Sequence, residues 1–177
     1  MALAAGAQSF IPPGGPSSMS TPTDTQLRAG ALAFERYLHA QIPLTRAMAV
    51  SVVTLNDEQA RLRAKFAPNV NHQCTAFGGS IAALATTVAW AYVHARLQRE
   101  APATVVIQRN TVDFIAPAHG DFEAWCGAPA AADWEHFRAV LARKGRARLD
   151  MTATVETAGR PIARFTGRYV ALRTPNG

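Results

Sequence analysis

The spacing of hydrophobic residues changes along the chain, and each spacing predicts a different element. The valine-rich run from Met48 to Leu55 predicts a strand. Between residues 60 and 66, apolar side chains alternate with arginine and lysine, which is typical of a half-buried strand. The Asn56-Asp57 pair between these runs is a turn signal, so the two strands are expected to form a hairpin.

The second half of the chain is predicted to be mostly sheet. Its strands are expected at residues 104–116, 121–127, 147–155 and 160–172. One helix interrupts them, because Trp134, Phe137 and Leu141 are spaced three and four residues apart within residues 132–144. The hydrophobic pattern therefore predicts six strands, with hairpins among them.

The beginning of the chain has a different composition. Residues 1–24 are rich in Ala, Gly, Pro and Ser, and they predict a disordered extension ahead of a domain that spans residues 25–175. Thr23 or Asp24 is suited to cap a first helix, which Pro43 would end. The apolar face of this helix is expected to consist of Leu27, Ala31, Phe34 and Leu38.

Residues 80–93 predict a helix that is apolar on nearly every side, and such helices are buried. A polar loop precedes this helix and ends in Gly78 and Gly79. The first amides of a helix have no partner within the helix, and glycine lets a ligand come close to them. The junction is therefore a candidate ligand site. The alternative is that the two glycines only permit tight packing.

Composition narrows the class of protein further. The 177 residues suit one domain, and two cysteines without a Cys/His cluster predict neither a disulfide scaffold nor a metal site. The apolar run Ile81–Val93 has 13 residues, whereas a membrane span needs about 20. Residues 1–24 lack the pattern of a signal peptide, so the cytoplasm is the expected location. Translation could start at Met1 or at Met19.

The formal net charge is +6, and basic residues are unevenly distributed. Such a charge is either a solvated surface or a binding surface for a partner with phosphates or acidic groups. No nucleic-acid-binding motif supports nucleic acid as that partner. The densest basic cluster consists of Arg143, Lys144, Arg146 and Arg148.

Together these elements predict an α+β fold. A flat sheet would leave the back of the apolar helix exposed, so the sheet is expected to wrap around it. The chain thus resembles hotdog thioesterases, in which an antiparallel sheet of about six strands wraps around a long central helix. More narrowly, the run from Asn71 to Ser80 is similar to the thioesterase family named for the C-terminal domain of YiiD.

This resemblance implies hydrolysis of an acyl thioester of coenzyme A or of acyl carrier protein. It also implies a homodimer or a pair of dimers, with the site at the subunit interface and with coenzyme A or phosphopantetheine present only as part of the substrate. The amide of Gly78 or Gly79 would polarise the thioester carbonyl, and Asn71 would orient substrate or water unless it only bonds its own loop. The substrate-binding residues would be Phe77, Thr86, Thr87, Arg143, Lys144, Arg146 and Arg148.

The general base has two candidates in the sequence. Many hotdog thioesterases carry Asp or Glu on the central helix, but that position falls at Thr86 here, and neither Thr86 nor Thr87 can act as a base. Asp113 and His72 remain as candidates for the base. The alternatives are that Asp113 is a solvent-facing carboxylate paired with Arg109, and that His72 is an ordinary loop residue.

Two classes of function follow. The first, which we favour, is a thioesterase with Asn71, His72, Gly78, Gly79 and Asp113 as its catalytic residues. The second is a non-catalytic module that binds acyl-CoA or acyl carrier protein, and the lack of a helix carboxylate favours it. A hotdog dehydratase with His72 as base is a weaker third alternative, because no glutamate on the helix accompanies the histidine.

Overall fold

The structure is a computed structural model that describes residues 24–173, with side chains from residue 28 onward. The predicted extension, apart from Asp24, lies outside the described residues, as do residues 174–175 of the predicted domain. The elements are α1 (Asp24–Gln41), α2 (Pro43–Ala47), β1 (Val50–Leu55), β2 (Gln59–Ala64), η1 (Ala67–Asn69), α3 (Gly78–Glu100), β3 (Ala103–Phe114), β4 (Phe122–Gly127), α4 (Ala131–Lys144), β5 (Arg146–Thr157) and β6 (Arg160–Arg173).

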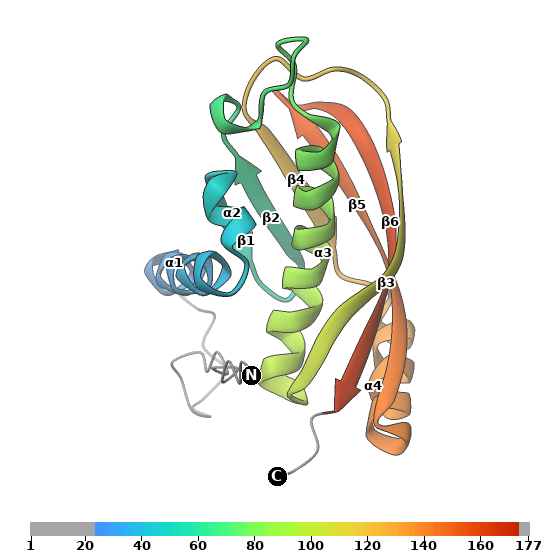
Figure 1. Cartoon of the computed structure of the whole chain (residues 1–177). Coiled ribbons are helices and arrows are strands. Elements are labelled where there is room, and N and C mark those ends of the chain that lie inside the picture. The colour runs from blue at the N-terminus through green and yellow to red at the C-terminus, as the bar shows by residue number, and fades with distance from the viewer. Residues whose placement is uncertain (1–23, 174–177) are drawn as a thin grey trace, which may run out of the picture.

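The six strands form one antiparallel sheet in the order β1-β2-β4-β5-β6-β3. Helix α3 lies in the concave face of this twisted sheet and contacts all six strands (Figure 1). The α+β class and the sheet wrapped around a long central helix are therefore confirmed. The first strand begins at Val50 rather than Met48, because Ala49 turns the chain with a φ of 50°.

Helix α3 is enclosed less completely than its composition predicts. Ten of its residues are buried, among them Leu84, Val88 and Leu97, which no solvent reaches. The sheet leaves one stripe of the helix only half-buried. This stripe consists of Ala82, Ala83, Thr86, Thr87 and Trp90.

Helix α1 covers one edge of the sheet. The carboxylate of Glu35 accepts a hydrogen bond from the amide of Val52 at 2.9 Å, and His39 Nε2 bonds the carbonyl of Val50 at 2.8 Å. Both backbone groups belong to the edge strand β1. Edge strands attract other strands when their backbone groups are free, so α1 protects this edge.

The other edge, β3, is covered over only part of its length. Trp90 Nε1 donates to the carbonyl of Val105 at 2.9 Å, and Gln98 Nε2 donates to that of Ala103 at 3.2 Å. From Val106 to Phe114, no side chain of the described residues bonds the backbone of β3. This half of the strand is an open edge that can pair with another strand.

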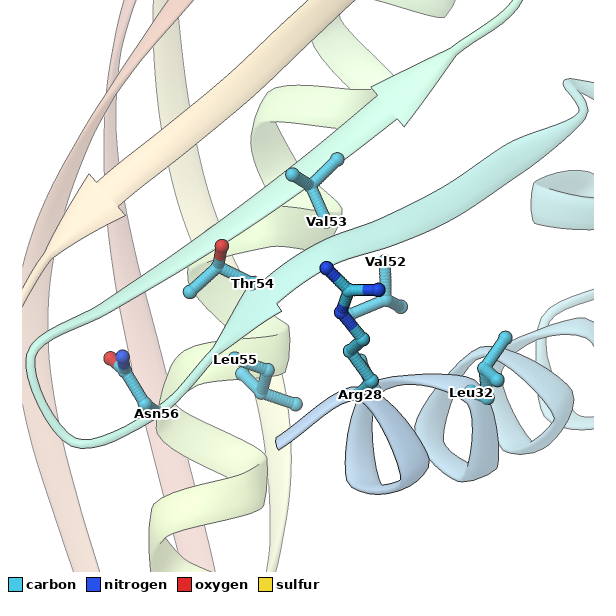
Figure 2. Close-up of a pocket in the computed structure, with 8 residues that line it drawn as sticks. Arg28, Leu32, Val52, Val53, Thr54, Leu55 and Asn56 are labelled. Carbon is cyan, nitrogen blue, oxygen red and sulfur yellow. The ribbon is translucent and has the colours of Figure 1, made fainter. Parts of the chain in front are cut away.

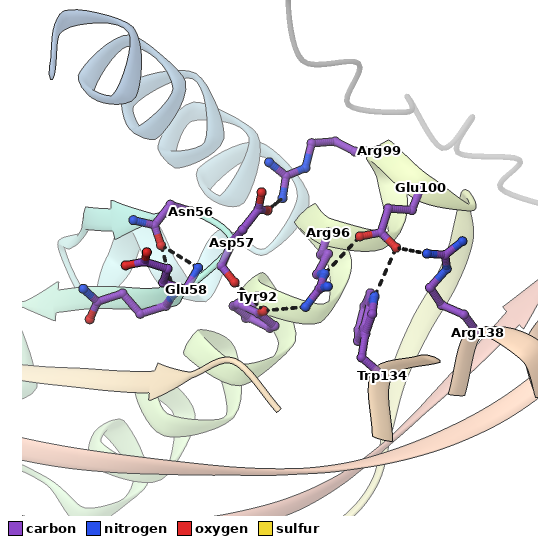
Figure 3. Close-up of polar contacts among 10 residues, drawn as sticks. Asn56, Asp57, Glu58, Tyr92, Arg96, Arg99, Glu100, Trp134 and Arg138 are labelled. Atoms are coloured by element: carbon purple, nitrogen blue, oxygen red, sulfur yellow. Dashed lines mark hydrogen bonds and ion pairs between the residues drawn. The ribbon is translucent and has the colours of Figure 1, made fainter. Parts of the chain in front are cut away.

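A polar network joins the end of α3 to its neighbours (Figure 3). Arg96 bonds Glu100 and the hydroxyl of Tyr92, and that hydroxyl donates to the carbonyl of Asp57 in the β1–β2 turn. Glu100 also accepts a hydrogen bond of 3.0 Å from Trp134 Nε1. These contacts fix α4 against the C-terminal end of α3, far from the two glycines.

No described helix is long and apolar enough to cross a membrane.

A buried histidine connects α3 with α1. The ring of His94 stacks between Tyr37, at 5.4 Å, and Trp90, at 4.5 Å between centroids. Its Nε2 atom is buried without a hydrogen-bond partner. Burial lowers the pKa of His94 to about 4, because the charged imidazolium loses its hydration there.

We expect the free energy of unfolding to fall by about 3 kcal/mol between pH 7 and pH 4 through His94 alone. The unfolded chain binds a proton below its ordinary histidine pKa of about 6.5, whereas the folded chain binds it only near pH 4, so protonation favours unfolding in this window. Urea denaturation at several pH values measures the effect. In His94→Phe, which keeps a stacked ring, the loss between pH 6.5 and 4.5 should be much smaller, and an unchanged loss would contradict the assignment.

Candidate active site at the start of helix α3

The loop before α3 is held closed by Asn71. Its Oδ1 accepts hydrogen bonds from the amides of Gln73, at 2.9 Å, and Thr75, at 3.2 Å, and its Nδ2 donates to Thr75 Oγ1 at 2.9 Å. The backbone N–H of Asn71 also donates to the backbone carbonyl of Thr75. Asn71 thus shapes the loop, and one Nδ2 hydrogen beyond the bond to Thr75 remains for a ligand. His72, next to it, is exposed.

The first turn of α3 presents two amides to solvent. The amides of Ser80 and Ile81 bond the carbonyl of Phe77 at 3.0 and 3.1 Å, and Phe77, the N-cap residue, makes no side-chain cap. The described residues provide no acceptor for the amides of Gly78 and Gly79. These two N–H groups lie at the positive end of the helix dipole, so they can bind a carbonyl oxygen that gains negative charge.

Two aromatic rings flank these glycines. A Cβ on Gly78 would lie 3.4 Å from the ring of Phe114, and a Cβ on Gly79 would overlap the ring of Phe77. Both rings are more than half exposed, as is Ile115. The start of α3 is therefore surrounded by apolar surface. The sequence did not point to Phe114, because nothing local shows that the end of β3 returns to Gly78.

The sheet register decides which β3 side chains face α3. Directly opposite residues of an antiparallel pair share a face of the sheet. Phe114 lies opposite Ala163 and Val112 opposite Phe165, both of which are buried on the α3 side. The side chain of Asp113 therefore lies on the outer face.

Asp113 lies opposite Arg164 on that outer face, and it is exposed. The structure gives it no hydrogen bond or ion pair among the described residues, with Arg109 or with any other. Asn110, opposite Gly167, is the polar β3 residue that faces α3, and no local pattern distinguished it because a bulge between Ile107 and Arg109 shifts the alternation.

The two threonines of α3 differ in their contacts. Thr87 Oγ1 donates to the carbonyl of Ala83 at 2.7 Å, one helical turn back. This bond is the usual arrangement of a threonine within a helix. Thr86 lies in the half-buried stripe, and its carbonyl accepts a hydrogen bond from the hydroxyl of Tyr169 at 2.7 Å. Neither threonine supplies a carboxylate, and the carboxylate that α3 does carry, Glu100, lies at the opposite end from the two glycines.

The basic cluster lies at the opposite end of the sheet from the start of α3 (Figure 1). Lys144, Arg146 and Arg148 line a hollow of about 430 Å³ between α4 and β5, together with His136. Arg143 does not line this hollow. Sequence reasoning missed His136, although its spacing of eight residues from Lys144 places both on one helix face.

A second hollow, of about 440 Å³, lies between α1 and the edge strand β1 (Figure 2). It contains none of the residues that the sequence predicted for the catalytic or substrate-binding site. The described residues contain no group of three or more His, Cys, Asp or Glu side chains that could hold a metal ion. The hollow is lined by Arg28, Ala31, Leu32, Val52, Val53, Thr54, Leu55 and Asn56.

Similar solved structures define the fold. A protein of unknown function from Chlorobaculum tepidum is similar with a TM-score of 0.77 at 25% identity, over 84% of this chain and 97% of that one. A putative thioesterase from Shewanella oneidensis is similar with a TM-score of 0.72 at 23% identity, over 80% and 96%. A mutant of the phenylacetic acid degradation protein PaaI from Thermus thermophilus is similar with a TM-score of 0.53 at 23% identity, over 75% of this chain and 99% of that one. The fold is that of the hotdog proteins.

The chain belongs to the family described as "Putative thioesterase (yiiD_Cterm)", whose pattern matches residues 31–173. This match confirms the resemblance that was based on the run from Asn71 to Ser80. No curated protein is similar to the chain at a significant level.

Proposed function

We propose that the chain hydrolyses acyl thioesters of coenzyme A or acyl carrier protein, with the thioester carbonyl at the start of α3. The observation that carries this proposal is the pair of free amides of Gly78 and Gly79, set in exposed apolar surface from Phe77 and Phe114. Membership of the thioesterase family supports it. Thr86, in the half-buried stripe of α3, would line the acyl group.

The chemistry needs little beyond these groups. A water oxygen attacks the carbonyl carbon, and the resulting oxyanion is stabilised by the two amides, which contribute most in the transition state. The C–S bond then breaks, the thiolate takes up the proton that the water loses, and a carboxylic acid and a thiol leave. The side chains are required to orient the water and to carry its proton.

The open half of β3 favours a site shared by two copies of the chain. That edge and the half-buried stripe of α3 adjoin one another through Trp90, which bonds β3. A second copy that pairs along β3 would cover both the free backbone groups and the stripe. We propose this homodimer, or a pair of such dimers, as the active form.

His72 is our first candidate for the proton carrier, because it belongs to the loop that ends at Gly78, whereas Asp113 faces the other side of the sheet. We expect His72→Ala to lower kcat by about 10²-fold, as for the loss of a general base, and Asp113→Asn to change it far less. Initial rates of thiol release measure both. The reverse result would assign the base to Asp113, reaching the site from a second chain.

Two substitutions of Asn71 test whether its side chain supports catalysis by shaping the loop or by contacting a ligand. Asn71→Ala removes every loop bond of the side chain, so we expect kcat to fall by about 10²-fold through misplacement of the loop. Asn71→Asp keeps the acceptor for Gln73 and Thr75 but loses the amide hydrogens. Near wild-type kcat in Asn71→Asp would limit Asn71 to shaping the loop through its Oδ1 bonds. A loss equal to that of Asn71→Ala would show that the Nδ2 hydrogens are required, one of which bonds Thr75 while the other is open to a ligand.

The alternative function is binding of acyl thioesters without hydrolysis, which the lack of a carboxylate near the two glycines of α3 favours. Thiol release from acyl-CoAs of graded length distinguishes the two, together with the melting temperature. The thioesterase releases thiol from at least one substrate. A non-catalytic module releases none, yet its melting temperature rises with acyl-CoA concentration because the ligand binds only the folded chain.

A further inference from the structure

One row of side chains on helix α3 runs beside strand β3. Ala82, Thr86 and Trp90 are four residues apart, so they lie in line along the helix, and all three are half-buried. Trp90 Nε1 donates to the carbonyl of Val105 at 2.9 Å, which holds the end of this row against β3. The row therefore faces the side of β3 that is turned towards α3.

Two contacts show how the row and the strand are aligned. The hydroxyl of Tyr169 donates to the carbonyl of Thr86 at 2.7 Å, and Tyr169 lies opposite Ile107 in the sheet. At the other end, the ring of Phe114 lies beside Gly78, where a Cβ would be 3.4 Å from it. Ile107 is thus level with Thr86, and Phe114 is level with the start of the helix.

Asn110 lies between these two levels. It is opposite Gly167, and its side chain is on the face of the sheet that is turned towards α3. On the helix, the residue midway between Gly78 and Thr86 is Ala82. Four residues of an α-helix rise about 6 Å, so Asn110 faces α3 about one turn from the two free amides.

Two polar groups without partners flank this place. The side-chain amide of Asn110 is exposed and makes no hydrogen bond with any residue that the structure describes. The hydroxyl of Thr86 also has no such bond, whereas that of Thr87 is bonded to the carbonyl of Ala83. Ala82, with only a methyl group, leaves room between the two for a group of a ligand.

The position of these groups relates them to the acyl part of the substrate. The thioester carbonyl is proposed to lie at Gly78 and Gly79, with the acyl group along the row that contains Thr86. Asn110 and Thr86 therefore meet the acyl group within a few carbon atoms of the carbonyl. A plain hydrocarbon chain would cover both polar groups without bonding them, which costs free energy.

We infer that the acyl group carries an oxygen substituent close to the thioester, and that Asn110 and Thr86 bind it. An amide and a hydroxyl both donate and accept, so they can bind a hydroxyl or a keto oxygen at the third carbon. The inference rests on the proposed function and names its substrate class. That class is the oxygenated acyl thioesters rather than the unsubstituted fatty acyl thioesters.

The first test is the ratio of kcat/KM for thiol release from 3-hydroxyacyl-CoA to that from unsubstituted acyl-CoA of the same length. The wild type should favour the hydroxylated substrate by about tenfold or more, because the analogue leaves the polar groups of the site unpaired. Asn110→Leu is similar in size and should bring the ratio to within about threefold of one. A 3-oxoacyl-CoA of that length shows whether the keto oxygen is preferred to the hydroxyl.

Two further variants accompany this comparison. Thr86→Val removes only the hydroxyl and should also lower the ratio, while its carbonyl still accepts the bond from Tyr169. The matched control is Thr166→Val, which makes a similar change on the outer face of the neighbouring strand β6 and should keep the wild-type ratio. A wild-type ratio near one, or an unchanged ratio in Asn110→Leu, would overturn the inference.

Other roles of Asn110 give different results. An equal fall of kcat/KM for all substrates in Asn110→Leu would assign the amide to water or pantetheine, which every substrate shares, and would overturn the inference. Pairing of two chains along β3 brings their Asn110 residues close to each other. An altered mass of Asn110→Leu in sedimentation velocity, with an unchanged ratio, would limit Asn110 to that contact and would also overturn the inference.

The proposed function fails separately from this inference. A wild type that releases no thiol from any acyl-CoA would contradict hydrolysis. Titration calorimetry would then use ketone analogues of the two acyl-CoAs, with a methylene in place of sulfur. Binding of the hydroxylated analogue about tenfold tighter by the wild type, but not by Asn110→Leu, would keep the inference, and equal affinities in the wild type would overturn it.

Discussion

Replacing Gly78 with proline should lower kcat for thioester hydrolysis by roughly 10²- to 10³-fold, the usual loss for one oxyanion donor. Proline lacks the amide hydrogen that Gly78 offers at the first position of α3. It is well tolerated at that position of a helix, and Phe77 before it already has the extended backbone, φ −65° and ψ 129°, that a following proline requires. The fold should therefore remain intact, with a wild-type circular dichroism spectrum and melting temperature.

Gly78→Ala is the control for added bulk. Its Cβ would lie 3.4 Å from the Phe114 ring, an ordinary contact, and its amide hydrogen is retained. We expect its kcat to stay within a few-fold of wild type. A Gly78→Pro enzyme with wild-type kcat would exclude the Gly78 amide as a required donor and would leave the Gly79 amide as the remaining candidate.

A lysine at Thr111 should prevent formation of the proposed dimer and abolish turnover with it. Thr111 is exposed in the open half of β3, close to the centre of the proposed pairing with a second copy. Two-fold pairing would bring the two lysines near each other, and like charges at an edge strand prevent pairing. Sedimentation velocity at micromolar concentration measures the mass, and thiol release measures the activity.

The matched control is Thr152→Lys. Thr152 lies opposite Thr166, and Thr166 lies opposite Thr111, so the two substituted positions share one row of the sheet and one face. Strand β5 lies two strands away from the open edge, so the control should remain a dimer with wild-type turnover. A Thr111→Lys protein that stays dimeric would contradict pairing along β3, and a fully active monomer would contradict the shared site.

The elements of the fold could be predicted because their patterns are local. The alternation from Ala147 to Val155 places one face of β5 in the core, and each of its inward residues is buried. Trp134, Phe137 and Leu141 are the buried face of α4, as their spacing predicts. The early start assigned to β1 was wrong, because the left-handed backbone of Ala49 has no sequence signal comparable to a glycine.

The site could be predicted only in part, because it depends on contacts between distant segments. The loop and the two glycines are continuous in sequence, so their junction with α3 was recognisable. The face on which Asp113 lies depends on its pairing with Arg164, 51 positions later, and Phe114 reaches Gly78 from 36 positions away. Likewise, only the fold shows that His136 and Arg148 line one hollow while Arg143 does not.

The central claim is that the start of α3 polarises the thioester carbonyl, and difference infrared spectroscopy tests it most directly. A ketone analogue of acyl-CoA, with a methylene in place of sulfur, keeps the carbonyl and cannot be hydrolysed. The account predicts that its C=O stretching band moves to lower wavenumber on binding to the wild type and to Gly78→Ala, and moves much less on binding to Gly78→Pro. A bound analogue whose band stays at its position in water for the wild type would contradict the claim.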